Sequence, residues 1–320
     1  MAAVLQVEGL TTNYRIQRGW VRATEDVSFD VQSAEALGIA GESGCGKTTV
    51  ALSILKILPS GGRIRKGKIL FEGRDLVPLS ESEMRSVRWR GISIVFQGAQ
   101  NALNPVFKVG YQIAEAIKTH EHNVPGAEVK ERVGNLLQLV GMEPSRADNY
   151  PHEFSGGMKQ RALIAMALAA NPKVLIADEP GTALDVIVQA QTLKLLRELK
   201  DKLGLSMIMI SHDLSIIAET CEKVAIMYAG RIVEYGDAKM IFKNPLHPYT
   251  QGLIKAFPSI KGERVKLQSI PGTPPDLLSP PTGCKFNPRC PYVMDICRKV
   301  DPSLDQHQEK DHLAACHLYS

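Results

Sequence analysis

The sequence contains no run of apolar residues long enough to cross a membrane. The longest, ALIAMALAA at 162–170, has nine residues, and a bilayer-spanning helix needs about twice that number. The opening residues, MAAVLQVEGL, lack the basic stretch followed by an apolar one that marks a signal peptide. We therefore expect a cytosolic protein, for which any membrane association must come through a partner.

A strong excess of charge of one sign is also missing. The 38 Lys and Arg residues against 34 Asp and Glu give a net charge of +4, which does not predict a nucleic-acid partner. The composition, 44% hydrophobic and 22% charged, is ordinary for a globular protein. The length of 320 residues allows one large domain with an appendage.

Cysteine is rare until the C-terminal end. Cys45 and Cys221 are isolated, and we expect them to pack as small side chains. The other four are Cys284, Cys290, Cys297 and Cys316. In a reducing cytosol such a cluster suggests metal or iron–sulfur ligation more than disulfides. Its spacing lacks the C-x2-C pairs of zinc ribbons and the tight runs of ferredoxins, so iron–sulfur, zinc and free thiols all stay open.

The remaining pattern divides the chain into zones. Strand-like runs occur at 35–40, 68–73, 92–96, 173–178, 205–210 and 224–228. Helical patterns predict helices at 47–57, 128–141 and 184–203, with Gly141 as a stop for the second. AGRIVEYG, which follows the last strand-like run, predicts a hairpin. Prolines crowd residues 258–291, a composition that resists regular structure.

GESGCGKT, Gly41 to Thr48, fits the phosphate-loop pattern and lies between a strand-like run and a helix. Its glycines let backbone N–H groups converge on phosphates. Lys47 can reach the outer phosphates, and the Thr48 hydroxyl can bind Mg²⁺. The residues predicted to contact nucleotide here are Gly41, Ser43, Gly44, Cys45, Gly46, Lys47, Thr48 and Thr49.

Three other strand-like runs end in side chains suited to phosphate chemistry. Gln97 follows one, Asp178 and Glu179 follow the second, and His212 follows the third. In an open parallel sheet, ligands bind at the carboxyl ends of the strands. Asp178 is suited to hold Mg²⁺, as is the Gln97 amide, and Glu179 is the candidate base for the attacking water. His212 is the candidate hydrogen-bond donor to the terminal phosphate.

A second helix N-terminus suited to bind an anion is predicted at EFSGGMKQR, where Ser155, Gly156 and Gly157 begin a helical pattern. A helix N-terminus offers free N–H groups and a positive dipole end. An ordinary capped helix begins in the same way. Because a helical zone separates Ser155 from Gly41, we expect this second start to bind the nucleotide that another subunit holds.

In combination these segments resemble an ATP-binding-cassette (ABC) ATPase over about residues 4–240. GESGCGKT matches the Walker A motif, FSGGMKQ the signature, VLIADE the Walker B motif, ALD at 183–185 the D-loop and SHD the H-loop. Gln97 matches the Q-loop, Tyr14 the aromatic residue that stacks on adenine, and Asp185 the D-loop aspartate. The resemblance implies a P-loop NTPase fold with a mostly parallel α/β core sheet, an antiparallel β subdomain and a helical subdomain. It also implies a head-to-tail dimer that holds two ATP molecules between Walker A and signature.

Longer segments narrow the resemblance. YPHEFSGGMKQRALIAMAL, ALDVIVQAQTL, NPLHPYTQGL and GCKFNPRCP resemble the D-type ATPase subunit of oligopeptide and dipeptide importers. The methionine after the signature glycines and LIADEP favour the D-type over its F-type partner. In that family four C-terminal cysteines hold a [4Fe–4S] cluster, and the resemblance assigns this role to Cys284, Cys290, Cys297 and Cys316.

The resemblance implies several partners. They are two transmembrane permease subunits, a second ATPase chain (F-type or a second copy) and, indirectly, an extracytoplasmic solute-binding protein. The chain departs from the family at Gly181, where threonine is usual, and at GAQNALNPV, where DPMTSLNPV is common. The second segment lies near the expected contact with the membrane subunits, so it bears on partner and cargo and not on hydrolysis.

We predict a nucleotide-binding domain at 1–255, with its helical subdomain at about 98–170, and a Pro/Cys-rich extension at 256–320. The predicted function is ATP hydrolysis at the cytoplasmic face of the membrane, driving uptake of di- or oligopeptides. The same machinery with an oligosaccharide or nickel cargo stays open, because other subunits choose the cargo. A DNA-repair or ribosomal cassette would have a long coiled-coil insertion or a second cassette, and the sequence shows neither. A small-molecule P-loop kinase is disfavoured by the signature and by the pair Gln97 and His212.

Overall fold

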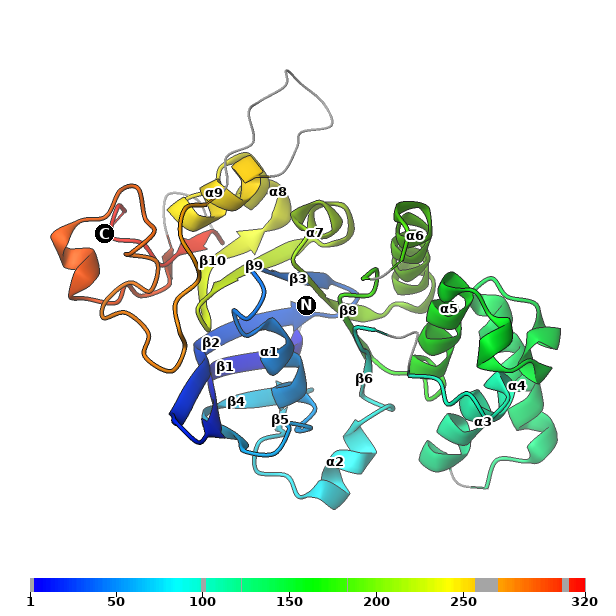
Figure 1. The fold of residues 1–320 in the computed structure, drawn as a ribbon. Coiled ribbons are helices and arrows are strands. Elements are labelled where there is room, and N and C mark those ends of the chain that lie inside the picture. The colour runs from blue at the N-terminus through cyan, green and yellow to red at the C-terminus, as the bar shows by residue number, and fades with distance from the viewer. Residues whose placement is uncertain are drawn as a thin grey trace. The chain divides into compact units, whose positions relative to one another are not determined.

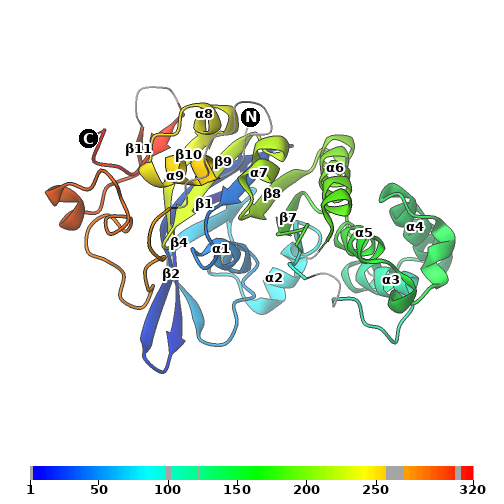
Figure 2. The ribbon, with the colours of Figure 1, turned by 45° about the horizontal axis from the view of Figure 1, so that its top comes forward.

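The computed structural model describes residues 3–98, 102–121, 123–182, 184–256, 270–306 and 311–319. The chain forms two compact units. The helical unit comprises Met1–Val4, Gln32–Ala34 and Pro78–Ile208, and the strand-rich unit comprises Leu5–Val31, Glu35–Val77 and Met209–Ser320. Figures 1 and 2 show the elements of each unit.

An antiparallel sheet of order β2-β1-β4-β5 opens the strand-rich unit. Its strands are β1 Ala3–Ile16, β2 Gly19–Gln32, β4 Gly62–Phe71 and β5 Arg74–Asp75. Along much of β1 and β2, buried positions alternate with partly or fully exposed ones, as expected for strands with one face on a core. Buried Thr12 and Ser53 share a hydrogen bond of 2.9 Å, which joins β1 to helix α1 (Lys47–Ile54).

A second sheet holds β3 (Ala36–Ala40) parallel to β9 (Lys223–Tyr228). β10 (Arg231–Asp237) returns antiparallel to β9, which confirms the predicted hairpin. Helices α7 (Leu214–Thr220), α8 (Ala238–Lys243) and α9 (Pro248–Ala256) belong to this unit (Figure 1). Gly38 is required in β3, because a Cβ there would lie 2.3 Å from Cγ2 of Ile217 on α7.

The helical unit contains β6 (Ile92–Val95) parallel to β7 (Val174–Asp178), and β8 (Ser206–Ser211) begins here. Its helices are α2 Glu81–Val87, α3 Val109–His120, α4 Gly126–Leu139, α5 Gly156–Ala167 and α6 Val186–Leu203. Two 3₁₀ turns, Pro144–Asp148 and Pro151–Glu153, precede α5. The helix predicted at 128–141 is α4. Val129, Val133 and Leu137 are buried on one face of it, and Gly141 follows it with a φ of 72°.

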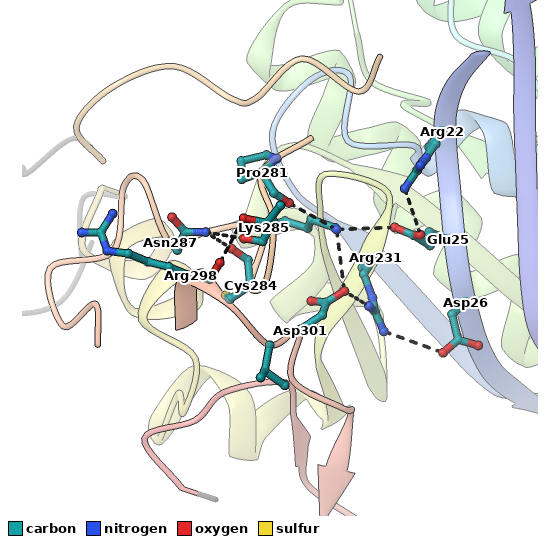
Figure 3. A network of polar contacts seen from close by, with 12 residues as sticks. Arg22, Glu25, Asp26, Arg231, Pro281, Cys284, Lys285, Asn287, Arg298 and Asp301 are labelled. Carbon is teal, nitrogen blue, oxygen red and sulfur yellow. Dashed lines mark hydrogen bonds and ion pairs between the residues drawn. The ribbon is translucent and has the colours of Figure 1, made fainter. Parts of the chain in front are cut away.

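The C-terminal extension has little regular structure in its described parts, as its proline content predicts. It contains a 3₁₀ turn at Asp295–Arg298 and the short strands β11 (Asp305–Gln306) and β12 (Leu313–Ala314). Within the strand-rich unit, ion pairs attach it to the sheets: Lys285 contacts Glu25 of β2 at 3.8 Å, and Asp301 contacts Arg231 of β10 (Figure 3). Among the described residues, no helix combines the length and apolar character that a membrane span needs.

Candidate phosphate-binding loop and its associated residues

The phosphate loop connects β3 to α1 through three glycines with left-handed backbone. Gly41, Gly44 and Gly46 have φ values of 149°, 80° and 105°. A Cβ on Gly41 would lie 2.2 Å from the carbonyl oxygen of Met227, and one on Gly46 would lie 2.3 Å from that of Ala23. The neighbouring backbone therefore admits glycine alone at both positions, and the loop leads into the N-terminus of α1, a position that favours anions.

Lys47 curls back across this loop. Its ammonium donates to the carbonyl oxygens of Gly41 at 2.7 Å and Glu42 at 3.0 Å, and the residue is 5% exposed. Burial raises the pKa of the neighbouring Cys45 thiol, an effect that Lys47 opposes. Cys45 is a packed neutral thiol, in agreement with the expectation that it fills a small space.

Thr48, the predicted Mg²⁺ ligand, is exposed, as are Ser43 and Gly44. Tyr14 lies in β1 beside the loop, and its hydroxyl donates to Oγ1 of Thr49 at 3.4 Å. His212 follows β8 and is exposed. The strand-rich unit thus holds Tyr14, the loop and His212. Of the residues expected to meet nucleotide in this unit, Ser43, Gly44, Thr48 and His212 are exposed.

The helical unit brings Gln97 and Glu179 together. Nε2 of Gln97 donates to Oε2 of Glu179 at 2.8 Å, and the hydroxyl of Thr182 donates to the same oxygen at 2.9 Å. Asp178 ends β7 and is 1% exposed, whereas Glu179 has a φ of 47°. Because this left-handed residue breaks the strand geometry, the two adjacent carboxylates have different surroundings.

Sequence reasoning missed Thr182. The available signal was a hydroxyl three residues after an acid in a turn, the spacing of local side-chain hydrogen bonds. Gly181, which replaces the family's usual threonine, also has a local explanation. A Cβ at this position would lie 2.6 Å from Cγ of Gln189, so the Gln189 side chain uses the space.

Ser155 caps helix α5. Its hydroxyl accepts a hydrogen bond from the N–H of Met158 at 3.3 Å, and the residue is exposed. A Cβ on Gly157 would lie 2.6 Å from Cγ1 of Val188, so the close approach of α6 requires the second signature glycine. The ordinary cap is therefore present, and the binding of a nucleotide from another subunit stays a prediction.

Asp185 caps helix α6 by accepting from the N–H of Val188 at 2.9 Å. Next to it, Val186 and Ile187 are 81% and 71% exposed. Ala183 of the D-loop lies outside the described residues. We predicted that the loop, Gln97, Glu179 and His212 meet at one sheet edge. Because these residues belong to two units, their meeting stays a prediction.

The C-terminal cysteines are free thiols. Burial raises the pKa of Cys284 to about 12, and the nearby sulfurs of Cys297 and Cys316 contribute to the increase. Burial also raises the pKa of Cys290 and of Cys316. Within the described residues, no three or more His, Cys, Asp or Glu side chains form a group that could hold a metal ion. The structure therefore gives no support to the predicted iron–sulfur cluster or to the zinc alternative.

Two family models match the chain. One, described as "ABC transporter", covers residues 24–182 and so includes the loop, Gln97 and the signature. The other, described as "Oligopeptide/dipeptide transporter, C-terminal region", covers residues 233–297. The second match includes α8, α9 and the first three cysteines of the extension.

Curated relatives match over nearly the whole chain. The dipeptide transport ATP-binding protein DppD of Caldanaerobacter subterraneus is 42% identical, covering 100% of this chain and 98% of its own. The oligopeptide transport ATP-binding protein OppD of Bacillus subtilis is 47% identical, covering 97% and 88%. DppD of Escherichia coli is 44% identical, covering 97% and 96%.

Solved structures agree on the fold. The dimeric ATP-binding cassette MJ0796 bound to ADP and Pi has a TM-score of 0.66 at 24% identity, covering 73% of this chain and 98% of its own. The protein cbiO1 of Clostridium perfringens, part of an ABC transporter complex, has a TM-score of 0.66 at 31% identity, covering 76% and 92%. With the loop and signature geometry, these matches confirm the expected fold, and the chain belongs to the ABC family of dipeptide and oligopeptide transport ATP-binding proteins.

Proposed function

We propose that the chain hydrolyses ATP at the cytoplasmic face of a membrane to drive import of di- or oligopeptides. Two permease subunits would form the channel, and a solute-binding protein would deliver the cargo. Support comes from the transport roles named for the full-length relatives and from the match of residues 233–297 to a peptide-transporter region. The same names favour peptides over an oligosaccharide or nickel cargo.

The geometry of the phosphate loop carries this proposal. The loop offers the N–H groups of a helix start, an ammonium and an exposed hydroxyl within one turn. A β- or γ-phosphate would replace the carbonyl oxygens of Gly41 and Glu42 as the partner of Lys47. The hydroxyl of Thr48 and the carboxylate of Asp178 are hard oxygen ligands, which fit Mg²⁺. When bound, Mg²⁺ would neutralise charge on the phosphates.

Glu179 is proposed as the general base. Gln97 and Thr182 both donate to Oε2 of Glu179, so these contacts orient the carboxylate that would accept a proton from water. His212, exposed after β8, would donate to the terminal phosphate, and Tyr14 would stack on adenine. These roles rest on the family motifs and on the accessibility of the side chains.

A second ATPase chain, F-type or a copy of this one, would complete each site. Ser155 is exposed at the start of α5, and its helix N-terminus would meet the phosphates of the other chain's nucleotide. The exposed Val186 and Ile187 beside Asp185 provide apolar surface for that partner.

The iron–sulfur cluster stays a separate proposal that rests on the family resemblance. Its test is direct: the chain purified without oxygen should contain iron and acid-labile sulfide, about four of each for a cubane cluster. Finding zinc, or no metal at all, would remove the cluster from the account.

Transport itself is the test of the proposed function. The chain is reconstituted in vesicles with two permease subunits and a solute-binding protein of a peptide importer, and ATP-dependent uptake of a labelled di- or tripeptide is measured. Uptake should occur with the native chain and be lost with Lys47→Ala. Uptake of nickel or an oligosaccharide, with no peptide uptake, would contradict the peptide assignment and leave the ATPase assignment intact.

A further inference from the structure

The extension contacts the phosphate loop through Arg289. Nη1 of Arg289 donates to Oε2 of Glu42 at 2.7 Å, and Nη2 donates to Oε1 at 2.9 Å. Glu42 directly follows the first glycine of the loop, and 247 positions separate the two residues. Paired parallel hydrogen bonds between a guanidinium and a carboxylate give direction as well as attraction.

Arg289 is itself held in place. Its Nε donates to the carbonyl oxygen of Pro271 at 2.8 Å, and Nη1 also donates to the hydroxyl of Tyr228 at 3.3 Å. The guanidinium lies 5.7 Å from the centre of the Tyr228 ring, and the side chain is 5% exposed. Because these partners already hold the Arg289 guanidinium in place, little side-chain freedom is lost when it pairs with the Glu42 carboxylate.

Glu42 is held from three directions. Arg289 contacts its carboxylate, the N–H of Glu42 donates to the Tyr249 hydroxyl at 2.9 Å, and its carbonyl oxygen accepts from Lys47. The Tyr228 and Tyr249 rings are 4.6 Å apart, and both contact Phe286 of the extension. This aromatic cluster packs behind the loop, and Phe286 and Arg289 bring the extension into it.

The charge at this position matters for an anionic ligand. The Glu42 carboxylate lies in a loop built to receive phosphates, and without a partner its negative charge would oppose them. The carboxylate is 28% exposed, so it is only partly screened by water. The guanidinium of Arg289 pairs with this carboxylate and offsets its negative charge.

We propose that Arg289 is a positioning residue for ATP binding, through which the C-terminal extension sets the affinity of the phosphate loop. The inference rests on the proposed role of Gly41–Thr49 as the ATP site. It does not depend on a metal at the cysteines, because every contact involved is made by protein atoms.

Lys285 provides a matched control. It lies in the same segment of the extension and is also a mostly buried cation, with an exposed fraction of 11%. Its ion pairs reach Glu25 of β2 and Asp301 rather than the loop (Figure 3). Loss of Lys285 therefore removes an anchor of the extension without removing the neutralising charge at Glu42.

The experiment measures equilibrium binding of Mg-ATP to the full-length chain, and the KM and kcat of ATP hydrolysis in the assembled transporter. Arg289→Ala should weaken binding and raise KM about fivefold, the effect of losing one partly screened ion pair, with kcat within about twofold. Arg289→Lys should restore part of the affinity. Arg289→Ala combined with Glu42→Gln should bind ATP more tightly than Arg289→Ala alone, because the uncompensated carboxylate has gone. Lys285→Ala should bind ATP as the native chain does.

Each outcome is decisive. ATP binding by Arg289→Ala at native affinity, or a further loss on adding Glu42→Gln, would overturn the inference. An equal loss in Lys285→Ala would show that the extension merely supports folding. Should Arg289→Ala fail to fold, judged by its thermal midpoint without nucleotide, Arg289→Lys and Glu42→Gln carry the comparison. Lys47→Ala tests the ATP site separately. Native ATP binding by Lys47→Ala would contradict the proposed function itself, and not only the role of the Arg289–Glu42 ion pair.

Discussion

At the scale of single residues, the carboxylate of Glu179 has the most specific setting. Asp178 and Glu179 are adjacent, yet only Glu179 has a left-handed backbone, and Gln97 and Thr182 both donate to it. Two neighbouring acids in different surroundings can take different roles, one on the metal and one on water. If Glu179 accepts the proton from the attacking water, replacing its carboxylate with an amide should abolish hydrolysis.

Glu179→Gln should retain Mg-ATP binding and lose hydrolysis by at least about a hundredfold, the contribution expected of general-base catalysis. Phosphate release and equilibrium nucleotide binding would be measured on the same preparation. Glu198→Gln, which removes an exposed acid from α6, is the control and should hydrolyse normally. Persistent turnover in Glu179→Gln would assign the base elsewhere.

His247 predicts a pH-dependent stability. It is 1% exposed, its Nδ1 accepts from the N–H of Tyr249 at 3.0 Å, and burial lowers its pKa to about 4 despite the opposing charge of Glu234. Because the folded pKa lies below the ordinary value, the unfolded chain binds the proton more readily. The neutral ring stabilises the fold above the ordinary pKa of histidine, and this stability is lost as pH falls toward 4.

The free energy of unfolding should therefore fall by about 3 kcal/mol through this one group between neutral pH and its folded pKa. Denaturant unfolding at a series of pH values would be compared between the native chain and His247→Asn. The native curve should fall more steeply in that window. Parallel curves would show that His247 titrates alike in both states.

At the scale of elements, the signature helix α5 is defined by its packing as much as by its cap. Gly157 faces α6 so closely that a methyl group would overlap Val188. Gly134, in the middle of α4, has no such neighbour: a Cβ there would meet Cβ of Pro144 at an ordinary 3.5 Å. An added methyl group should therefore be tolerated at Gly134 and should disturb the packing at Gly157.

Gly157→Ala should lower the free energy of unfolding by about 1–3 kcal/mol, the cost of overpacking a close contact. Val188→Ala in the same background should recover part of the loss. Gly134→Ala should leave stability equal or raise it by up to about 1 kcal/mol, since alanine favours the helix. Chemical denaturation measures all three. Equal stability of Gly157→Ala and the native chain would contradict the close approach.

At the scale of the whole molecule, the two units divide the predicted site residues between them. The strand-rich unit holds the phosphate loop, and the helical unit holds Glu179 and Ser155. Ser155 is exposed at the start of α5, and under the proposed function it would complete the site of a second chain. If a second chain completes the site as proposed, one chain alone should bind ATP and should not hydrolyse it.

Ser155→Arg should leave Mg-ATP binding to the isolated chain unchanged and reduce hydrolysis in the assembled transporter by about a hundredfold or more, as loss of a transition-state donor does. Ser145→Arg, a substitution at an exposed serine in the same unit, should hydrolyse normally. Weakened ATP binding in isolated Ser155→Arg would place the serine at its own chain's nucleotide instead.

The family, the ABC fold, the helix at α4 and the β9–β10 hairpin could all be predicted from the amino-acid order. The helix and the hairpin depend on periodicity and turn residues that act over a few neighbouring positions, whereas the family and the fold rest on the resemblance of the motifs. The resemblance also supplied the iron–sulfur prediction, which the arrangement of the four cysteines does not support.

Contacts between distant positions required the folded chain. Nothing in GESGCGKT or GCKFNPRCP indicates that Glu42 and Arg289 pair, or that Gly157 is needed because of Val188. Such pairs form because packing brings separate segments within a few ångströms, and each segment alone is compatible with many partners. Local chemistry identifies the phosphate loop, and the packing around it decides which residues hold that loop in place.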